Sequence, residues 1–348
     1  MLTTAPNERR DQPPAAGDGP PGGPRPGGGP GGGGPPGGGV TPPPKRRGPR
    51  WLRILAVVLA VPLYVAVSIV YVRGAGDTSQ TATEVVGDHT LPVVGAEMKF
   101  DSPLKIEPGW TTIAFRNDGG LAHQASIYKL HDGIDGNDLA QQLRANRDAW
   151  NGKADPVGGI GGIPAGKSQQ VSLDLATGHY LITCFLRGGS AIGESHVQFG
   201  MARVLDVQPA AAGANPGSPP ASTGEFVLRD DGFTFPDGFN GHGVFKVTNA
   251  GTQPHELSIL RLGAGKSDKD FLNFMQASAM AEQGGPKPTG GPPFSNVGGF
   301  TIANPGISGV MVIDLEPGSY LASDFIPDPT KGGLPHFMGG MLKPFEVK

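Results

Sequence analysis

The most restrictive feature of this 348-residue sequence is a long internal repeat. The stretch FRNDGGLAHQASIYKL, which begins at Phe115, has a counterpart in VTNAGTQPHELSILRL, which begins at Val247. A second pair, VSLDLATGHYLITC from Val171 and MVIDLEPGSYLASD from Met311, follows at an offset of 140 residues instead of 132. Matching landmarks of this kind indicate that one folding unit occurs twice. We therefore predict two domains, residues 84–209 and 224–348, and a linker at 210–223 that is rich in Ala, Gly, Pro and Ser.

Both repeats have the pattern of antiparallel β-sheet. Their apolar residues alternate with polar ones between clusters of Gly, Pro, Asn and Asp, as in the strands of a sandwich. The middle of each repeat differs, because residues 137–150 have helical spacing and Ser267 begins a capping-type helix start. The expected fold class is all-β, with two tandem Greek-key β-sandwich domains that each carry a short helical insertion.

The N-terminal region differs in composition from the repeats. Residues 1–50 are rich in Pro and Gly and lack an apolar pattern, so we expect a disordered tail. Residues 51–73 contain an uncharged apolar run long enough to cross the roughly 30 Å hydrocarbon core of a bilayer. We predict a transmembrane helix there, and a cleaved signal peptide is the rival interpretation.

Charge predicts the orientation of this helix. Eight Lys and Arg against three acids occur up to Arg53, and few basic residues follow the apolar run directly. The positive-inside rule then makes the chain a single-pass membrane protein with a cytoplasmic N-terminus and extracytoplasmic domains. The part after Arg53 has a net charge near −8, which argues against nucleic-acid binding.

The first repeat contains a set of metal-ligand residue types. His123 follows an expected strand, and Cys184, the only cysteine, is followed by His196 and Met201 in a C-x(11)-H-x(4)-M pattern. Two His, one Cys and a weak axial Met are the ligands of blue-copper electron-transfer sites. The sequence therefore predicts that these four residues meet at one end of the sandwich and bind copper.

The second repeat keeps three of these four residue types. His255, His336 and Met341 occupy the equivalent positions, while Asp324 stands in place of the cysteine. Without a thiolate this set is no blue-copper site. It is either a degenerate site that has lost its metal or a two-His-one-carboxylate site for Cu(II) or Zn(II).

On the motifs N-x-G-x-x-x-H, D-L-x-x-G-x-Y-x-x-x-C and H-x(4)-M, the sequence resembles the cupredoxin family over both repeats. The resemblance implies that His123, Cys184 and His196 are equatorial copper ligands and that Met201 is the axial ligand. It also implies electron transfer or copper handling, with a redox partner or a copper donor or acceptor protein. The alternative is a metal-free interaction or scaffold module of the cell envelope.

Two-domain copper enzymes with this resemblance supply further ligands from a His beside the Cys and from H-x-H pairs. Here Cys184 lies between Thr183 and Phe185, and the sequence contains no H-x-H pair. We therefore expect that the protein is not an enzyme.

Overall fold

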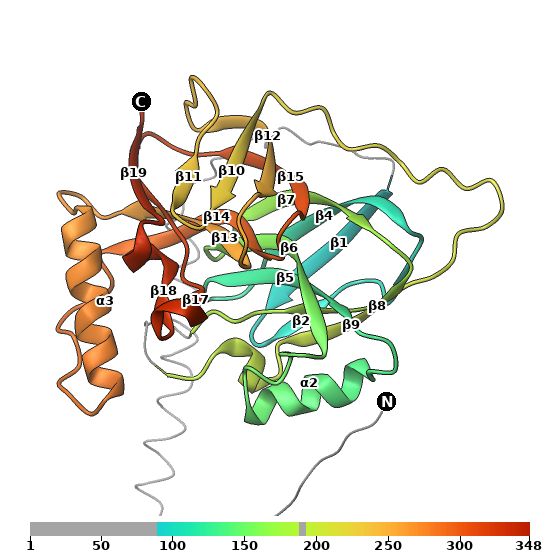
Figure 1. Ribbon diagram of the computed structural model, residues 1–348, viewed down its shortest axis with the longest axis horizontal. Coiled ribbons are helices and arrows are strands. Elements are labelled where there is room, and N and C mark those ends of the chain that lie inside the picture. Colours follow the sequence, from blue (N-terminus) through green and yellow to red (C-terminus); the bar gives the residue numbers. More distant parts are fainter. Residues whose placement is uncertain (1–88, 188–192) are drawn as a thin grey trace, which may run out of the picture. The chain divides into compact units, whose positions relative to one another are not determined.

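A computed structural model describes residues 89–187 and 193–348 (Figure 1). The predicted tail (1–50), the predicted transmembrane helix (51–73) and the first five residues of the first predicted domain lie outside this part of the chain. Within it, no helix combines the length and the apolar character needed to cross a membrane.

The first repeat consists mainly of strands. In chain order its elements are β1 (His89–Ala96), β2 (Lys99–Asp101), β3 (Lys105–Ile106), β4 (Gly109–Asn117), β5 (His123–Leu130), α2 (Gly136–Ala145), β6 (Ala154–Ile163), β7 (Ser168–Leu175), β8 (Gly178–Thr183), the short 3-10 helix η1 (His196–Phe199) and β9 (Ala202–Val207).

The second repeat has the same order of long strands. Its elements are β10 (Gly224–Arg229), β11 (Gly232–Thr234), β12 (His242–Asn249), β13 (His255–Leu262), α3 (Asp268–Glu282), β14 (Phe294–Ala303), β15 (Ser308–Asp314), β16 (Gly318–Ser323), β17 (Pro327–Asp328), η2 (Pro329–Lys331), β18 (Leu334–Pro335), η3 (His336–Gly339) and β19 (Leu342–Val347).

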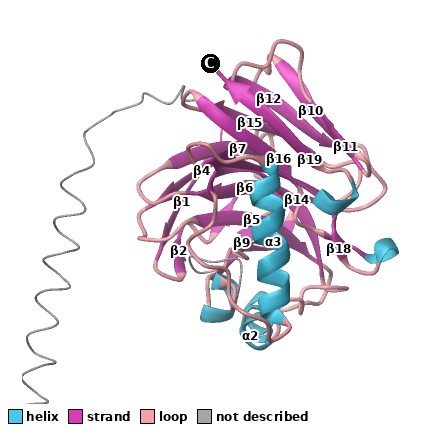
Figure 2. Ribbon diagram, turned by 90° about the vertical axis from the view of Figure 1, so that its left-hand side faces the viewer, coloured by secondary structure: helices cyan, strands magenta, loops and turns pink. Residues whose placement is uncertain are grey.

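The prediction of a mainly β fold with one helix in the middle of each repeat is confirmed, and both helices lie outside the strands (Figure 2). The helix α3 begins as expected, because Ser267 and Asp270 form a capping box. The helix α2 is shorter than predicted: Asn146 is extended at φ −143° and ψ 109° and ends it. Trp150 therefore lies beyond the helix, where its ring packs against Tyr128 with centroids 5.1 Å apart.

The expectation of two separate sandwiches is corrected by the sheet topology. The strands form two large sheets that both run through both repeats, in the orders β11-β10-β12-β15-β7-β4-β1-β2 and β19-β16-β13-β14-β6-β5-β8-β9-β3. The repeats join where β15 pairs with β7 and β14 pairs with β6, antiparallel in both cases. In Figure 1 the orange strands of the second repeat accordingly continue into the green strands of the first.

This junction, which we call the seam, depends on glycine and on a shared core. A Cβ atom at Gly161 of β6 would lie 2.7 Å from the carbonyl oxygen of Gly298 in β14, so a larger residue cannot fit there. Phe300 of β14 is 1% exposed and belongs to the same hydrophobic cluster as core residues of the first repeat. Its ring reaches Gly158, where a Cβ atom would lie 2.4 Å away.

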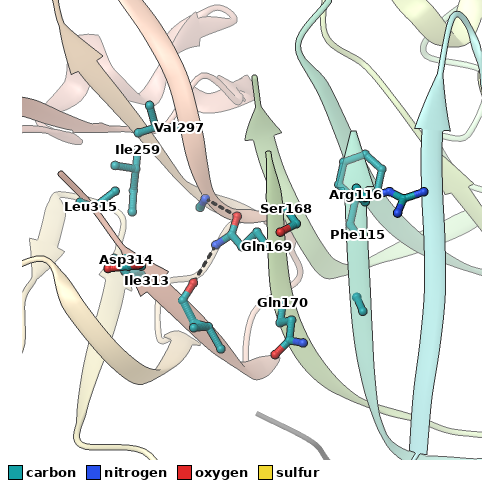
Figure 3. A pocket seen from close by; sticks show the side chains of 13 residues that line it. Phe115, Arg116, Ser168, Gln169, Gln170, Ile259, Val297, Ile313, Asp314 and Leu315 are labelled. Atoms are coloured by element: carbon teal, nitrogen blue, oxygen red, sulfur yellow. Dashed lines mark hydrogen bonds between the residues drawn. The ribbon is translucent and has the colours of Figure 1, made fainter. Parts of the chain in front are cut away.

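A glutamine ties the two sheets together at the seam. The side chain of Gln169, from β7, accepts a hydrogen bond from the Gly299 N–H at 3.1 Å and donates one to the Val312 carbonyl at 3.3 Å (Figure 3). It lines a cavity of about 340 Å³ whose walls come from both repeats.

The D-L-x-x-G-x-Y motif forms a corner in each repeat. The Tyr180 hydroxyl donates to the Ala176 carbonyl, and the Tyr320 hydroxyl donates to the Glu316 carbonyl, four residues upstream in both cases. Such a tyrosine corner fixes the turn that leads into the following strand. In the first repeat that strand is β8, and Cys184 follows its last residue.

Candidate metal centres

Asn117 positions the loop that carries His123. Its side-chain amide donates to the carbonyls of Leu121 at 2.7 Å and Ile163 at 3.0 Å. Its side-chain oxygen accepts from the Gly119 N–H at 3.0 Å. Three hydrogen bonds therefore hold the turn between β4 and β5, and His123 is the first residue after it.

Asn249 does the same for His255. Its amide donates to the carbonyls of Gln253 and Ala303, both at 2.8 Å, and its oxygen accepts from the Gly251 N–H at 2.9 Å. The asparagine of the N-x-G-x-x-x-H motif thus acts as a structural clamp in both repeats. The sequence pattern identified this residue without revealing its role.

The glycine of the same motif leaves room for the histidine ring. A Cβ atom at Gly119 would lie 2.8 Å from Nε2 of His123, and one at Gly251 would lie 2.7 Å from Nε2 of His255. Real Cβ atoms do not approach other atoms this closely. Glycine is therefore required for these ring positions.

The backbone brings the other three predicted ligands of the first repeat together. The Cys184 N–H donates to the Met201 carbonyl at 3.2 Å, and the Met201 N–H donates to the His196 carbonyl at 3.0 Å. The Val197 N–H donates back to the Cys184 carbonyl at 2.8 Å. This closed set of bonds holds the end of β8, η1 and the start of β9 together, so residues 17 positions apart in the chain meet at one place.

Three donor atoms converge in the first repeat. Nδ1 of His123 lies 3.0 Å from Nδ1 of His196, and Sγ of Cys184 lies 3.4 Å from Nδ1 of His196 and 3.9 Å from Nδ1 of His123. In a trigonal site with bonds of about 2.0 Å to nitrogen and 2.3 Å to sulfur, the donors would be roughly 3.5–3.7 Å apart. The observed spacing fits such a site after shifts of a few tenths of an ångström.

This cluster, which we call site 1, is closed to water. His123, Cys184, His196 and Met201 are all 0% exposed. Burial raises the pKa of the Cys184 thiol to about 12. Hydrogen bonds from the backbone of Gln124 and Leu186 lower this pKa but do not offset the effect of burial. Burial also lowers the pKa of both histidines, that of His196 to about 4. Both imidazoles are therefore neutral at pH 7 and able to offer Nδ1 to a metal.

The second repeat builds the same backbone arrangement around Asp324. The Asp324 N–H donates to the Met341 carbonyl at 3.2 Å, and the Met341 N–H donates to the His336 carbonyl at 3.1 Å. The Phe337 N–H donates to the Asp324 carbonyl at 2.9 Å. Each bond has a counterpart of almost equal length in site 1, so Asp324 takes the place of Cys184 in space as well as in sequence.

The donor atoms of this second cluster, site 2, also converge. Oδ2 of Asp324 lies 2.8 Å from Nδ1 of His255 and 3.0 Å from Nδ1 of His336, and the two Nδ1 atoms are 3.1 Å apart. His255 and Asp324 are 0% exposed and His336 is 2% exposed. Met341 is also fully buried. The two sites are the only groups of three such metal-ligating side chains among the described residues.

Asp230 joins site 2 from the turn between β10 and β11. Its Oδ1 accepts from Nε2 of His255 at 2.9 Å, and its carboxylate also accepts from the backbone and hydroxyl of Thr252. Partial burial opposes these bonds, but together they lower the pKa of Asp230 to about 2. Burial lowers the pKa of His255, yet hydrogen bonds with Asp324 and Asp230 outweigh it and raise that pKa above its ordinary value. No pattern in the sequence indicated Asp230.

Each repeat therefore brings two histidine Nδ1 atoms together with the residue that follows one strand. That residue is Cys184 after β8 in the first repeat and Asp324 after β16 in the second. These are cupredoxin-like domains. The tandem arrangement is the one that the sequence motifs predicted, and the His123–Cys184–His196 cluster is a candidate copper site.

No protein-family model matches the chain, and no curated protein matches it. Among solved structures, the chain is similar to auracyanin from Roseiflexus castenholzii, with 19% identity, 36% of this chain and 100% of that chain covered, and a TM-score of 0.26. It is also similar to a multicopper oxidase (13% identity, 74% and 88% covered, TM-score 0.20) and to copper nitrite reductase from Nitrosomonas europaea (14% identity, 74% and 93% covered, TM-score 0.19).

The prediction that the protein is not an enzyme is contradicted by these last comparisons, because both proteins are enzymes by name. That prediction depended on the absence of short linear motifs. Tertiary structure, however, assembles metal ligands from distant positions, as it does for His123 and Cys184, which are 61 residues apart. The absence of an H-x-H pair was therefore no basis for excluding catalysis.

Proposed function

We propose that the first repeat binds one copper ion through His123, Cys184 and His196, with Met201 as axial ligand, and that the protein uses it to transfer single electrons. The observation that carries this proposal is the convergence of two imidazole Nδ1 atoms and one thiol sulfur within 3.9 Å of one another. Thiolate and imidazole together suit copper in both oxidation states.

The surroundings of site 1 support electron transfer over copper delivery. The Asn117 clamp and the backbone bonds around Cys184 hold the donors in position without a metal. A bound copper ion supplies a one-electron couple, and a rigid cage limits the rearrangement between its two states. Delivery of copper to another protein requires access to the ligands, and all four are 0% exposed. A metal-free scaffold has no observation of its own in its favour.

We also propose the setting in which this chemistry takes place. The apolar run within residues 51–73 anchors the chain in a membrane, residues 1–50 lie in the cytoplasm, and domains 84–209 and 224–348 are extracytoplasmic, where a redox partner meets them. Sequence composition supports this part. Retention of the full chain in the membrane fraction after alkaline extraction tests the anchor, and protease digestion of intact cells tests the orientation.

The copper proposal is tested on the full chain loaded with Cu(II). We expect one copper per site 1 and an intense visible absorption band from charge transfer between the Cys184 thiolate and copper, reversibly bleached by a one-electron reductant. Cys184→Ser should remove the band, because a hydroxyl does not replace a thiolate. His179→Gln is the matched control: His179 is exposed and paired with Asp206, so its loss should leave the band unchanged. A colourless copper-treated protein would overturn the proposal.

A further inference from the structure

We infer that site 2 is a metal site in its own right, at which His255, Asp324 and His336 bind one borderline divalent cation, Zn(II) or Cu(II). This goes beyond the proposed function, which concerns copper at site 1 only. Of the two interpretations that the sequence left open, the structure favours a working site over a degenerate one.

The first reason is that the three donor atoms face one another and are buried. They lie within 3.1 Å of one another, and none of their residues is more than 2% exposed. All three are lone-pair donors when the histidines are neutral, and a buried group of this kind requires a proton or a cation at its centre. Two imidazoles and one carboxylate are a ligand set typical of Zn(II) and Cu(II).

The second reason is the hydrogen bond between Asp230 and His255. Asp230 accepts the proton of Nε2, and this leaves the lone pair of Nδ1 directed at Asp324 and His336. A carboxylate that holds the outer nitrogen of a ligating histidine is a regular feature of metal sites, because it fixes the tautomer and increases ligand basicity. Thr252 in turn holds Asp230 through two hydrogen bonds.

Site 1 lacks this arrangement. Glu97 lies in the equivalent turn and accepts from the Gly120 N–H, as Asp230 accepts from the Thr252 N–H. Glu97 does not reach the histidine, since Nε2 of His123 has no hydrogen-bond partner. The carboxylate on the ligand histidine is therefore specific to the repeat that carries Asp324.

The third reason is that two of the differences between the sites bring a carboxylate to the donor atoms. Asp324 replaces Cys184, Glu256 replaces Gln124 beside it, and Asp230 contacts the ligand histidine where Glu97 does not. The Glu256 N–H donates to Asp324 Oδ2 at 3.3 Å, as the Gln124 N–H donates to Cys184 Sγ at 3.4 Å in site 1. Asp324 puts a carboxylate among the donors, and Asp230 brings one into contact with His255, whereas burial raises the pKa of Glu256 to about 8 and leaves that group neutral at pH 7. A harder and more anionic cage suits a divalent cation and disfavours Cu(I).

The rival explanation is a buried pair in which a proton on His255 satisfies Asp324 without any metal. A metal-binding measurement distinguishes the two explanations. It uses the full chain with Cys184→Ser, which removes the thiolate of site 1. After treatment with a chelator, this variant is titrated with Zn(II) and, separately, with Cu(II), and bound metal is counted by elemental analysis. We expect one ion per chain in both arms, a rise in the unfolding temperature, and no thiolate band with Cu(II).

Two further substitutions in that background identify the site. Asp324→Asn removes a ligand and should abolish the stoichiometric binding. Asp230→Asn leaves the three ligands in place and should weaken zinc affinity 10- to 100-fold, the usual effect of losing such a partner. The matched control is Glu97→Gln, the equivalent residue of the first repeat, which should change zinc affinity by less than twofold.

The inference is overturned if the Cys184→Ser chain binds no more Zn(II) or Cu(II) than the same chain with Asp324→Asn. Circular dichroism verifies that the Asp324→Asn chain is folded, and His336→Gln replaces it if it is not. Asp324→Cys gives an independent test: in the Cys184→Ser background it should produce a thiolate–copper band, and a colourless, folded protein would contradict a metal-sized cage. Failure of site 1 is recognised separately by the loss of the wild-type band, so the two proposals can fail independently.

Discussion

At the scale of single residues, Gly119 decides the position of a ligand without being one. A Cβ atom there would lie 2.8 Å from Nε2 of His123, so Gly119→Ala must displace the ring. We predict that this variant binds copper at least tenfold more weakly, while its free energy of unfolding changes by no more than about 2 kcal/mol. A copper competition titration and a urea unfolding curve measure the two effects.

The neighbouring glycine provides the control for this substitution. A Cβ atom at Gly120 would meet only the Glu97 carboxylate, at an ordinary distance of 3.5 Å. Gly120→Ala should therefore keep wild-type copper affinity. Equal copper affinity in the two variants would show that the position of the His123 ring is not under the control of Gly119.

The sequence predicted the ligand positions because duplication presented each of them twice. His123 and His255, or Cys184 and Asp324, could be matched without any structure. Asp230 could not be found in this way. It lies outside the repeated motifs, its counterpart is a different residue at a slightly different offset, and the two side chains differ in whether they touch the histidine.

At the scale of secondary-structure elements, α3 provides a direct test of helix capping. The Ser267 hydroxyl accepts from the Asp270 N–H, and the Asp270 carboxylate accepts from the Ser267 N–H at 2.9 Å. We predict that Ser267→Ala lowers the free energy of unfolding by about 1 kcal/mol, because it leaves the Asp270 N–H without its capping partner. Urea unfolding measures this loss.

Lys269 is the control position in the same turn. It is exposed and takes no part in the capping box, so Lys269→Ala should change stability by less than about 0.5 kcal/mol. A Ser267→Ala chain as stable as the Lys269→Ala chain would mean that tertiary packing, and not the cap, holds the start of α3.

Sequence patterns predicted the existence of both helices better than their ends. The start of α3 follows from side chains close together in sequence, and such local signals are readable. The end of α2 comes at Asn146, whose extended backbone stops the helix before Trp150, and no residue pattern in the sequence marks that position. The short helices η1 and η3, which begin at the second histidine of each site, carry no pattern that would distinguish them from a loop.

At the scale of the whole molecule, the shared core predicts that the two repeats unfold together. Phe300→Ala, in the second repeat, removes a buried ring that packs against Gly158 of the first. We predict a loss of about 3–5 kcal/mol and a drop in unfolding temperature of roughly 6–20 °C. Tryptophan fluorescence should record the same drop as circular dichroism, although Trp110 and Trp150 both belong to the first repeat.

This experiment uses a chain in which Trp51, outside the described residues, is replaced by Phe, so that fluorescence reports the first repeat alone. Coincident transitions indicate one cooperative unit. If Phe300→Ala left the fluorescence transition unchanged and shifted only circular dichroism, the repeats would be independent domains in spite of the continuous sheets.

The seam is the part of the fold that the sequence patterns did not predict. Strand pairing between repeats leaves no periodic pattern, because it depends on which edges meet and not on the residues within one strand. One signal was present: Val157-Gly158-Gly159 and Val297-Gly298-Gly299 occur at the same offset, 140 residues, in both copies. Gly159 and Gly299 both have φ near +131°, a conformation that favours glycine.

The pairing of β6 with β14 and of β7 with β15 also has a consequence for the history of the chain. A gene for either repeat alone would encode two sheets that each gain an unpaired edge at the seam, and unpaired edges promote aggregation. Once each copy covered the seam edges of the other, the loss of one copy would have exposed the edges of the remaining one. The shared sheets therefore give a reason to keep the second repeat that does not depend on the chemistry of site 2.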